Sequence, residues 1–180
     1  MIKDINKLLF LDIETVGITK DLNSLQSEFP QLCNIWEKTG YDYCKRRYPK
    51  DDHLSSEEMF IKKAALLPEF GRIVCVSVGF ILNDGETKLD SYTGNEKTIL
   101  ENVITLFNRV DKLGFSLCGH NIKSFDLPYM GKKMLVYNLP LPKILPTYND
   151  KPWETRVVDT KEVWGFNSYI GLSSLDLICA

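Results

Sequence analysis

The clearest hydrophobic pattern near the start of the chain is a short, almost continuous apolar run. It covers Lys7 to Ile13, and after Lys7 only Asp12 interrupts it. A run of this length and composition is typical of a β-strand that is buried on both faces. We therefore expect it to be the central strand of a sheet.

Between about residues 24 and 67, the apolar positions take the spacing of helices. One stripe begins at Leu25 and a second at Met59. Ser55 and Glu58 have the spacing of a capping box, which predicts that the second helix begins there. The stripes consist of Leu25, Phe29, Leu32, Ile35 and Trp36, and of Met59, Phe60, Ala64 and Leu67.

The rest of the chain alternates between strand and helix signals. Arg72 to Leu82 alternates and is rich in Val and Ile, and the turn Asn83–Gly85 follows it, so a β-hairpin is expected. The elements expected after that turn are a strand at 87–92, a helix from about 93 to 110, a strand at 115–118, a helix from 126 to about 137, a proline-rich loop at 138–153, a strand at 156–159 and a helix near 173. This order predicts an α/β fold in which helices cover a mixed sheet.

Composition is that of one ordered domain. The chain has 180 residues, of which 44% are hydrophobic and 26% charged, and its formal net charge is −2. We expect a single domain over 1–180, with a helical insertion at about 20–68 after the first strand. The five cysteines include no Cys-x-x-Cys pair, and no run of eighteen apolar residues occurs. Both features favour a cytoplasmic protein with reduced thiols and no membrane association.

Two acids follow each other at alternate positions where the first strand ends. Asp12 and Glu14 project from the same side of that strand, about 7 Å apart along it. Two carboxylates so placed can share metal ions, although a bare Asp-x-Glu more often caps a frayed strand end. A third acid, Asp126, again lies just beyond an apolar strand, at the start of an expected helix.

These acids lie in two segments that resemble motifs of a nuclease superfamily. Phe10–Thr15 (Phe-Leu-Asp-Ile-Glu-Thr) resembles the first exonuclease motif of the DEDD nucleases. Asn121–Tyr129 (Asn-x-x-x-Phe-Asp-x-Pro-Tyr) resembles the second motif in its family B DNA polymerase form. The resemblance is to predicted 3′-to-5′ exonucleases related to the polymerase B proofreading domain, of the DnaQ-like superfamily. It extends over essentially the whole chain and implies a ribonuclease H-like fold.

The resemblance also implies a mechanism. Asp12, Glu14 and Asp126 would hold two Mg²⁺ or Mn²⁺ ions, hard cations that prefer oxygen ligands and suit in-line attack on a phosphodiester. The product would be a nucleoside monophosphate released from a 3′ end. Thr15 is where the terminal nucleotide would rest. Asn121 and Phe125 would orient Asp126 and line the nucleotide cleft.

Plainer interpretations of several residues remain open. Asn121 could be only a turn residue, and Phe125 could be only a core aromatic. His120 precedes the second motif, so we expect it to have a structural or peripheral role, and His53 lies in a polar loop.

The family's third motif, a Tyr or His shortly before a fourth carboxylate, has no match. Asp159 and Asp176 are the late acids, and neither has Tyr or His at the required offset. We therefore expect both to be structural. We further expect a domain that is truncated before the third motif and that hydrolyses slowly or not at all.

Three functions remain open. The polymerase resemblance favours an exonuclease that acts on single-stranded DNA 3′ ends in replication, proofreading or repair, with a DNA polymerase or another replication protein as partner. Loss of the third motif leaves a noncatalytic module that binds nucleic-acid ends or a replication partner. An exoribonuclease is the third alternative, since RNA is the substrate of other DEDD enzymes.

Overall fold

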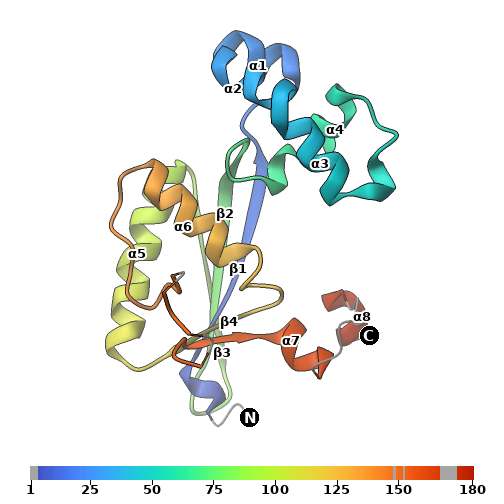
Figure 1. Ribbon diagram of the computed structural model, residues 1–180. Coiled ribbons are helices and arrows are strands. Elements are labelled where there is room, and N and C mark those ends of the chain that lie inside the picture. Colours follow the sequence, from blue (N-terminus) through green and yellow to red (C-terminus); the bar gives the residue numbers. More distant parts are fainter. Residues whose placement is uncertain (1–3, 148, 152, 167–173) are drawn as a thin grey trace. The chain divides into compact units, whose positions relative to one another are not determined.

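The computed structural model describes residues 4–147, 149–151, 153–166 and 174–180 (Figure 1). The chain forms two compact units. The first unit combines Met1–Glu14 with Val74–Ala180, and the second comprises Thr15–Ile73. Within the described ranges, no helix has both the length and the apolar character needed to cross a lipid bilayer.

A five-stranded mixed sheet has the order β3-β2-β1-β4-β5. The strands are β1 (Leu8–Gly17), β2 (Gly71–Ile81), β3 (Thr87–Thr93), β4 (Ser116–Gly119) and β5 (Val157–Asp159). β2 and β3 are antiparallel, as the predicted hairpin requires, whereas β1 pairs with β4, and β4 with β5, in parallel. The expected α/β fold with a mixed sheet and a central first strand is confirmed.

Two long helices accompany the sheet in the first unit. α5 (Glu96–Lys112) begins after Asn95, whose side chain accepts hydrogen bonds from the backbone N–H groups of Lys97 and Thr98. The apolar stripe expected for this helix is buried, and α5 contacts β3 and α6 (Asp126–Val136). α5 and α6 lie side by side in Figure 1. The shorter helices of this unit are η1 (Ile5–Lys7), α7 (Thr160–Gly165) and α8 (Leu175–Cys179).

The second unit is helical, as predicted, but broken into short pieces. They are α1 (Leu22–Glu28), α2 (Pro30–Ile35), the π-helical turn η2 (Trp36–Gly40), α3 (Tyr41–Arg47), η3 (Pro49–Asp51), α4 (Ser56–Lys63) and η4 (Ala64–Leu66). The capping box of Ser55 and Glu58 is present at the start of α4. The first apolar stripe was predicted wrongly at Phe29 and Ile35, which are exposed. Pro30 starts a new helix directly after Phe29, so the two residues do not continue the stripe of α1.

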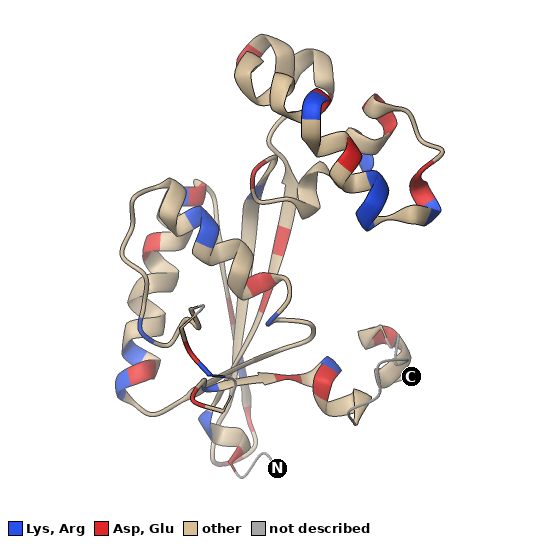
Figure 2. Ribbon diagram, in the orientation of Figure 1, with Lys and Arg blue, Asp and Glu red and all other residues tan. Residues whose placement is uncertain are grey.

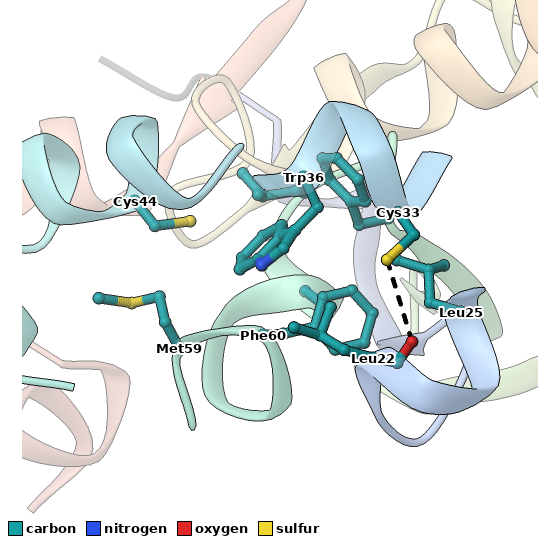
Figure 3. Packing of buried hydrophobic residues seen from close by; sticks show 10 residues of the cluster. Leu22, Leu25, Cys33, Trp36, Cys44, Met59 and Phe60 are labelled. Atoms are coloured by element: carbon teal, nitrogen blue, oxygen red, sulfur yellow. Dashed lines mark hydrogen bonds between the residues drawn. The ribbon is translucent and has the colours of Figure 1, made fainter. Parts of the chain in front are cut away.

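Trp36 is the centre of the core of the second unit (Figure 3). Its ring packs edge-on against Phe60 and Phe70, with ring centroids 5.0 Å and 5.1 Å away. Its indole N–H donates to the Ser56 hydroxyl over 3.1 Å, so burial leaves the indole nitrogen satisfied. Gly40 lies about one helical turn after Trp36. A Cβ at Gly40 would lie 2.9 Å from the Trp36 ring, so only glycine fits at this position.

Shortening a side chain in this core should destabilise the second unit. Phe60→Ala removes a fully buried ring and is expected to lower the free energy of unfolding by about 3–5 kcal/mol. Urea unfolding followed by tryptophan fluorescence measures the change. Ile61→Ala, at the exposed neighbouring position, is the matched control and should change stability by less than about 0.5 kcal/mol. Equal losses in the two variants would contradict this packing.

Candidate active site

Asp12 and Glu14 lie on one side of β1, toward its carboxyl end. Along that strand, Leu11 and Ile13 are buried while Asp12 and Glu14 are exposed. The prediction that this strand is buried on both faces is therefore wrong at its end. The alternation of strand side chains points the apolar residues into the core and presents the two carboxylates to solvent.

Asp126 is buried and hydrogen-bonded to the first strand. It is the first residue of α6, the residue is only 3% exposed, and its Oδ1 accepts the backbone N–H of Ile13 over 3.0 Å. The paired register of β1 with β4 covers Leu8 to Phe10 and so ends before Ile13. The N–H of Ile13 is therefore bonded by a side chain instead of a neighbouring strand, as a buried backbone donor requires.

The negative charge of Asp12 affects the pKa of Asp126. Burial and, second to it, the negative charge of Asp12 raise the pKa of Asp126 to about 7, against the opposing effect of the hydrogen bond from Ile13. Partial desolvation also raises the pKa of Asp12. The structure thus brings together one carboxylate from each predicted motif, although their residues lie more than a hundred positions apart.

Asn121 shapes the loop that leads to Asp126. Its φ of 61° lies in the left-handed region, which asparagine tolerates better than most residues. Its backbone carbonyl accepts the N–H groups of Ser124 and Phe125, over 3.1 Å each. Its side-chain oxygen accepts Lys161 Nζ, also over 3.1 Å. Asn121 is thus a turn residue whose amide oxygen is already engaged within the protein.

Phe125 and Thr15 occupy less informative positions. Phe125 is half-buried, and its ring is tilted by 59° against the buried Tyr129 ring, 5.5 Å away. This contact is that of an aromatic at the margin of the core. Thr15 follows Glu14 on β1, is half-buried and belongs to the second unit.

Asp159 anchors the Asn121 loop, a role that the sequence did not reveal. It is 3% exposed, and its carboxylate accepts the backbone N–H groups of Asn121 over 2.9 Å, Lys123 over 3.1 Å and Lys161 over 3.0 Å. The last of these bonds caps α7, which was not predicted. The signal was present, because Asp159 and Glu162 have the spacing of a helix start. The structural role expected of Asp159 is confirmed, and its contacts extend that role to the site.

His120, for which a structural or peripheral role is expected, is hydrogen-bonded within the protein. Its Nδ1 lies 3.1 Å from the hydroxyl of Thr160, which in turn donates to the carbonyl of Gly119 over 3.3 Å. Gly119 ends β4 close to β1, since a Cβ there would lie 2.7 Å from the carbonyl oxygen of Leu11. The loop therefore leaves β4 at a position where only glycine fits.

The described carboxylates are not grouped as a metal site would require. Across residues 4–147, 149–151, 153–166 and 174–180, no three His, Cys, Asp or Glu side chains are grouped so that they could hold a metal ion. Asp12 and Asp126 supply oxygen ligands of the type that Mg²⁺ and Mn²⁺ prefer. Figure 2 shows acidic and basic residues interspersed over the elements of each unit.

Stability should depend on pH through Asp126. Its pKa of about 7 is raised above the ordinary value of 3.8, so the folded protein holds this proton more tightly than the unfolded chain. The resulting stabilisation is complete below about pH 4 and is lost as the pH rises through about 7, a decrease of up to roughly 4 kcal/mol. Urea unfolding in the presence of EDTA, at a series of pH values, measures it.

Asp126→Asn should abolish this component of the pH dependence, because an amide keeps the acceptor for Ile13 and cannot ionise. The exposed Asp52→Asn is the control and should leave it in place. An unchanged slope in Asp126→Asn would mean that another group titrates.

Replacing Asp159 should loosen the Asn121 loop. Asp159→Ala removes the shared acceptor of three backbone N–H groups and is expected to cost about 2–3 kcal/mol of stability. Amide hydrogen exchange should become faster at Asn121 and Lys123. Asp84→Ala, which removes an exposed turn acceptor for Glu86, is the control and should leave both amides protected. Unchanged exchange in Asp159→Ala would contradict the anchoring role.

Comparisons of the chain with protein-family models, with curated proteins and with solved structures found no match.

Proposed function

We propose that this chain carries the catalytic carboxylates of a metal-dependent 3′-to-5′ exonuclease with a ribonuclease H-like fold. The observation that carries the proposal is the buried Asp126, hydrogen-bonded to Ile13 and under the charge of Asp12. Two sequence segments that resemble successive nuclease motifs thus meet at one point. The mixed sheet, with the first segment on its central strand, is compatible with this fold.

The protein's own residues would divide the work as follows. The N–H of Ile13 fixes the orientation of the Asp126 carboxylate, and the backbone N–H groups held by Asp159 fix the loop before it. Asp12 lies beside Asp126, and Glu14 extends the acidic edge on the same side of β1. Bound Mg²⁺ or Mn²⁺ ions would offset this negative charge and supply the activation of water and the stabilisation of the departing oxygen.

DNA is the proposed substrate in preference to RNA, because the second motif resembles its family B DNA polymerase form. Such a chain would act on single-stranded 3′ ends and, in proofreading, would work beside a separate polymerase. The side-chain oxygen of Asn121 accepts a hydrogen bond from Lys161, so we do not assign it a contact to the 2′-hydroxyl of RNA.

A noncatalytic module that binds nucleic-acid ends is the second candidate. It is favoured by the lack of a third metal-ligating side chain beside Asp12 and Asp126 among the described residues. Against it stands the cost of keeping a buried acid next to a second negative charge. A module that only binds would be more stable with an amide at position 126.

Metal binding and strand hydrolysis test the proposal together. Mn²⁺ binding, followed by electron paramagnetic resonance, should be weakened by about 100-fold or more in Asp12→Asn and in Asp126→Asn. Release of mononucleotides from 3′-labelled single-stranded DNA should fall by at least as much in both variants. Glu86→Gln, an exposed turn carboxylate on the hairpin, is the matched control and should behave as the unaltered chain.

Two outcomes would contradict the proposal. If the unaltered chain and the three variants bind Mn²⁺ with equal affinity, then Asp12 and Asp126 are not metal ligands. Binding of strand ends that changes neither on addition of Mn²⁺ nor on replacement of Asp12 and Asp126 would favour the noncatalytic module.

A further inference from the structure

β3 is the edge strand of the sheet, and its side chains are solvent-exposed on both faces. Of its seven residues only Tyr92 is half-buried and the others are exposed. The exposed fraction of Leu89, in the middle of the strand, is 81%. A long edge strand with an exposed apolar residue is a template for pairing with another strand.

The hydrogen bonding of the hairpin decides which backbone groups of β3 face outward. Leu82 N donates to Glu86 O over 2.8 Å, so this pair is of the hydrogen-bonded type. The type recurs at every second position, and therefore Lys88, Asp90 and Tyr92 bond toward β2. The residues whose N–H and C=O groups point away from β2 are Thr87, Leu89, Ser91 and Thr93.

We propose that β3 is a dimerisation edge, through which two copies of this chain pair in antiparallel fashion about a two-fold axis at Leu89. In that register, each Leu89 lies opposite the other, and their outward N–H and C=O groups exchange two hydrogen bonds. Lys88 of each copy lies opposite Asp90 of the other. One sheet then runs through both copies.

Charge selects this register over its neighbours. A two-fold axis at Lys88 would place Lys88 opposite Lys88, and Glu86 opposite Asp90. An axis at Asp90 would place Asp90 opposite Asp90. Like charges directly opposite each other are destabilising, whereas opposite charges stabilise a strand pair. A two-fold axis at Leu89 thus gives two Lys88–Asp90 pairs on one face of the strands and a contact between the two Leu89 side chains on the other face.

The ion pairs occupy the closer of the two kinds of cross-strand position. Because Leu89 pairs through hydrogen bonds, Lys88 and Asp90 fall in non-hydrogen-bonded pairs, where the Cα atoms are only about 4.5 Å apart. In the single chain, Asp90 Oδ1 accepts the outward N–H of Ser91 over 2.8 Å. On pairing, Ser91 N–H donates instead to Thr87 O of the second copy, and Asp90 is released to Lys88. No backbone donor is left unsatisfied by the exchange.

The same charges explain why a second copy is the expected partner. Charged residues on an edge strand oppose pairing with unrelated strands. Here Lys88 and Asp90 flank Leu89 symmetrically, so this strand is complementary to itself when reversed. This inference concerns the hairpin alone and does not rest on nuclease activity.

Sedimentation equilibrium over a concentration series tests the proposal. A dimer that dissociates in the range of about 10 µM to 1 mM is expected, since the strand interface is small. Lys88→Asp turns both attractive pairs into Asp–Asp repulsions and should weaken dimerisation by about tenfold or more. Asp90→Lys combined with Lys88→Asp restores opposite charges and should return the dissociation constant to within about threefold of the original.

Lys143→Asp makes the same charge change at an exposed position away from the hairpin and is the control. Far-ultraviolet circular dichroism of each variant verifies that the fold is kept. A chain that stays monomeric at the highest concentration would overturn the proposal. So would a dimer that Lys88→Asp does not weaken, or one that the double replacement fails to restore.

Discussion

The hydrogen bond from Ile13 N–H to the Asp126 carboxylate is the contact on which the site depends. It joins the end of β1 to the start of α6 at the position where β1 has left its pairing with β4. The N–H needs an acceptor because it is buried, and the acceptor that the fold supplies is a carboxylate. One constraint of backbone satisfaction therefore places a titratable group in the interior.

The loop before Asp126 is also held by β5, which pairs with β4 on the side away from β1. β5 runs parallel to β4, and the register puts Asp159 opposite Gly119, where β4 ends. From there its carboxylate reaches the N–H groups of Asn121 and Lys123 in the following loop. The segment between β4 and α6 is thus fixed at both ends by buried carboxylates. Asp159 holds the loop after β4, and Asp126, the first residue of α6, is bonded to Ile13. A strand late in the chain thus helps to determine the geometry of the loop that precedes α6.

Much of the fold could be predicted because its signals are local. The stripe of α5, the capping box at Ser55 and the hairpin turn at Gly85 each depend on residues close in the chain. The π-helical turn at Trp36 and the start of α2 at Pro30 were not predicted, because they depend on how short helices pack around one indole ring. Asp12 and Asp126 were predicted from two separate motifs, and they lie close enough for the charge of Asp12 to raise the pKa of Asp126. The burial of Asp126 and the exposure of Asp12 could not be predicted from the sequence, since both depend on how distant segments of the chain pack against each other.

The remaining question is why position 126 holds an acid at all. An asparagine there would keep the hydrogen bond from Ile13 and avoid the desolvation and repulsion that raise the pKa of Asp126 to about 7. A purely structural requirement would therefore be met better by the amide. The carboxylate differs from the amide in its charge, and a charge that is unfavourable in the protein alone becomes favourable beside a cation. The same reasoning does not extend to Asp159, whose three N–H donors already balance its charge, or to the exposed Glu14. The electrostatic cost at Asp126 is thus the physical argument for the metal-dependent reaction that we propose.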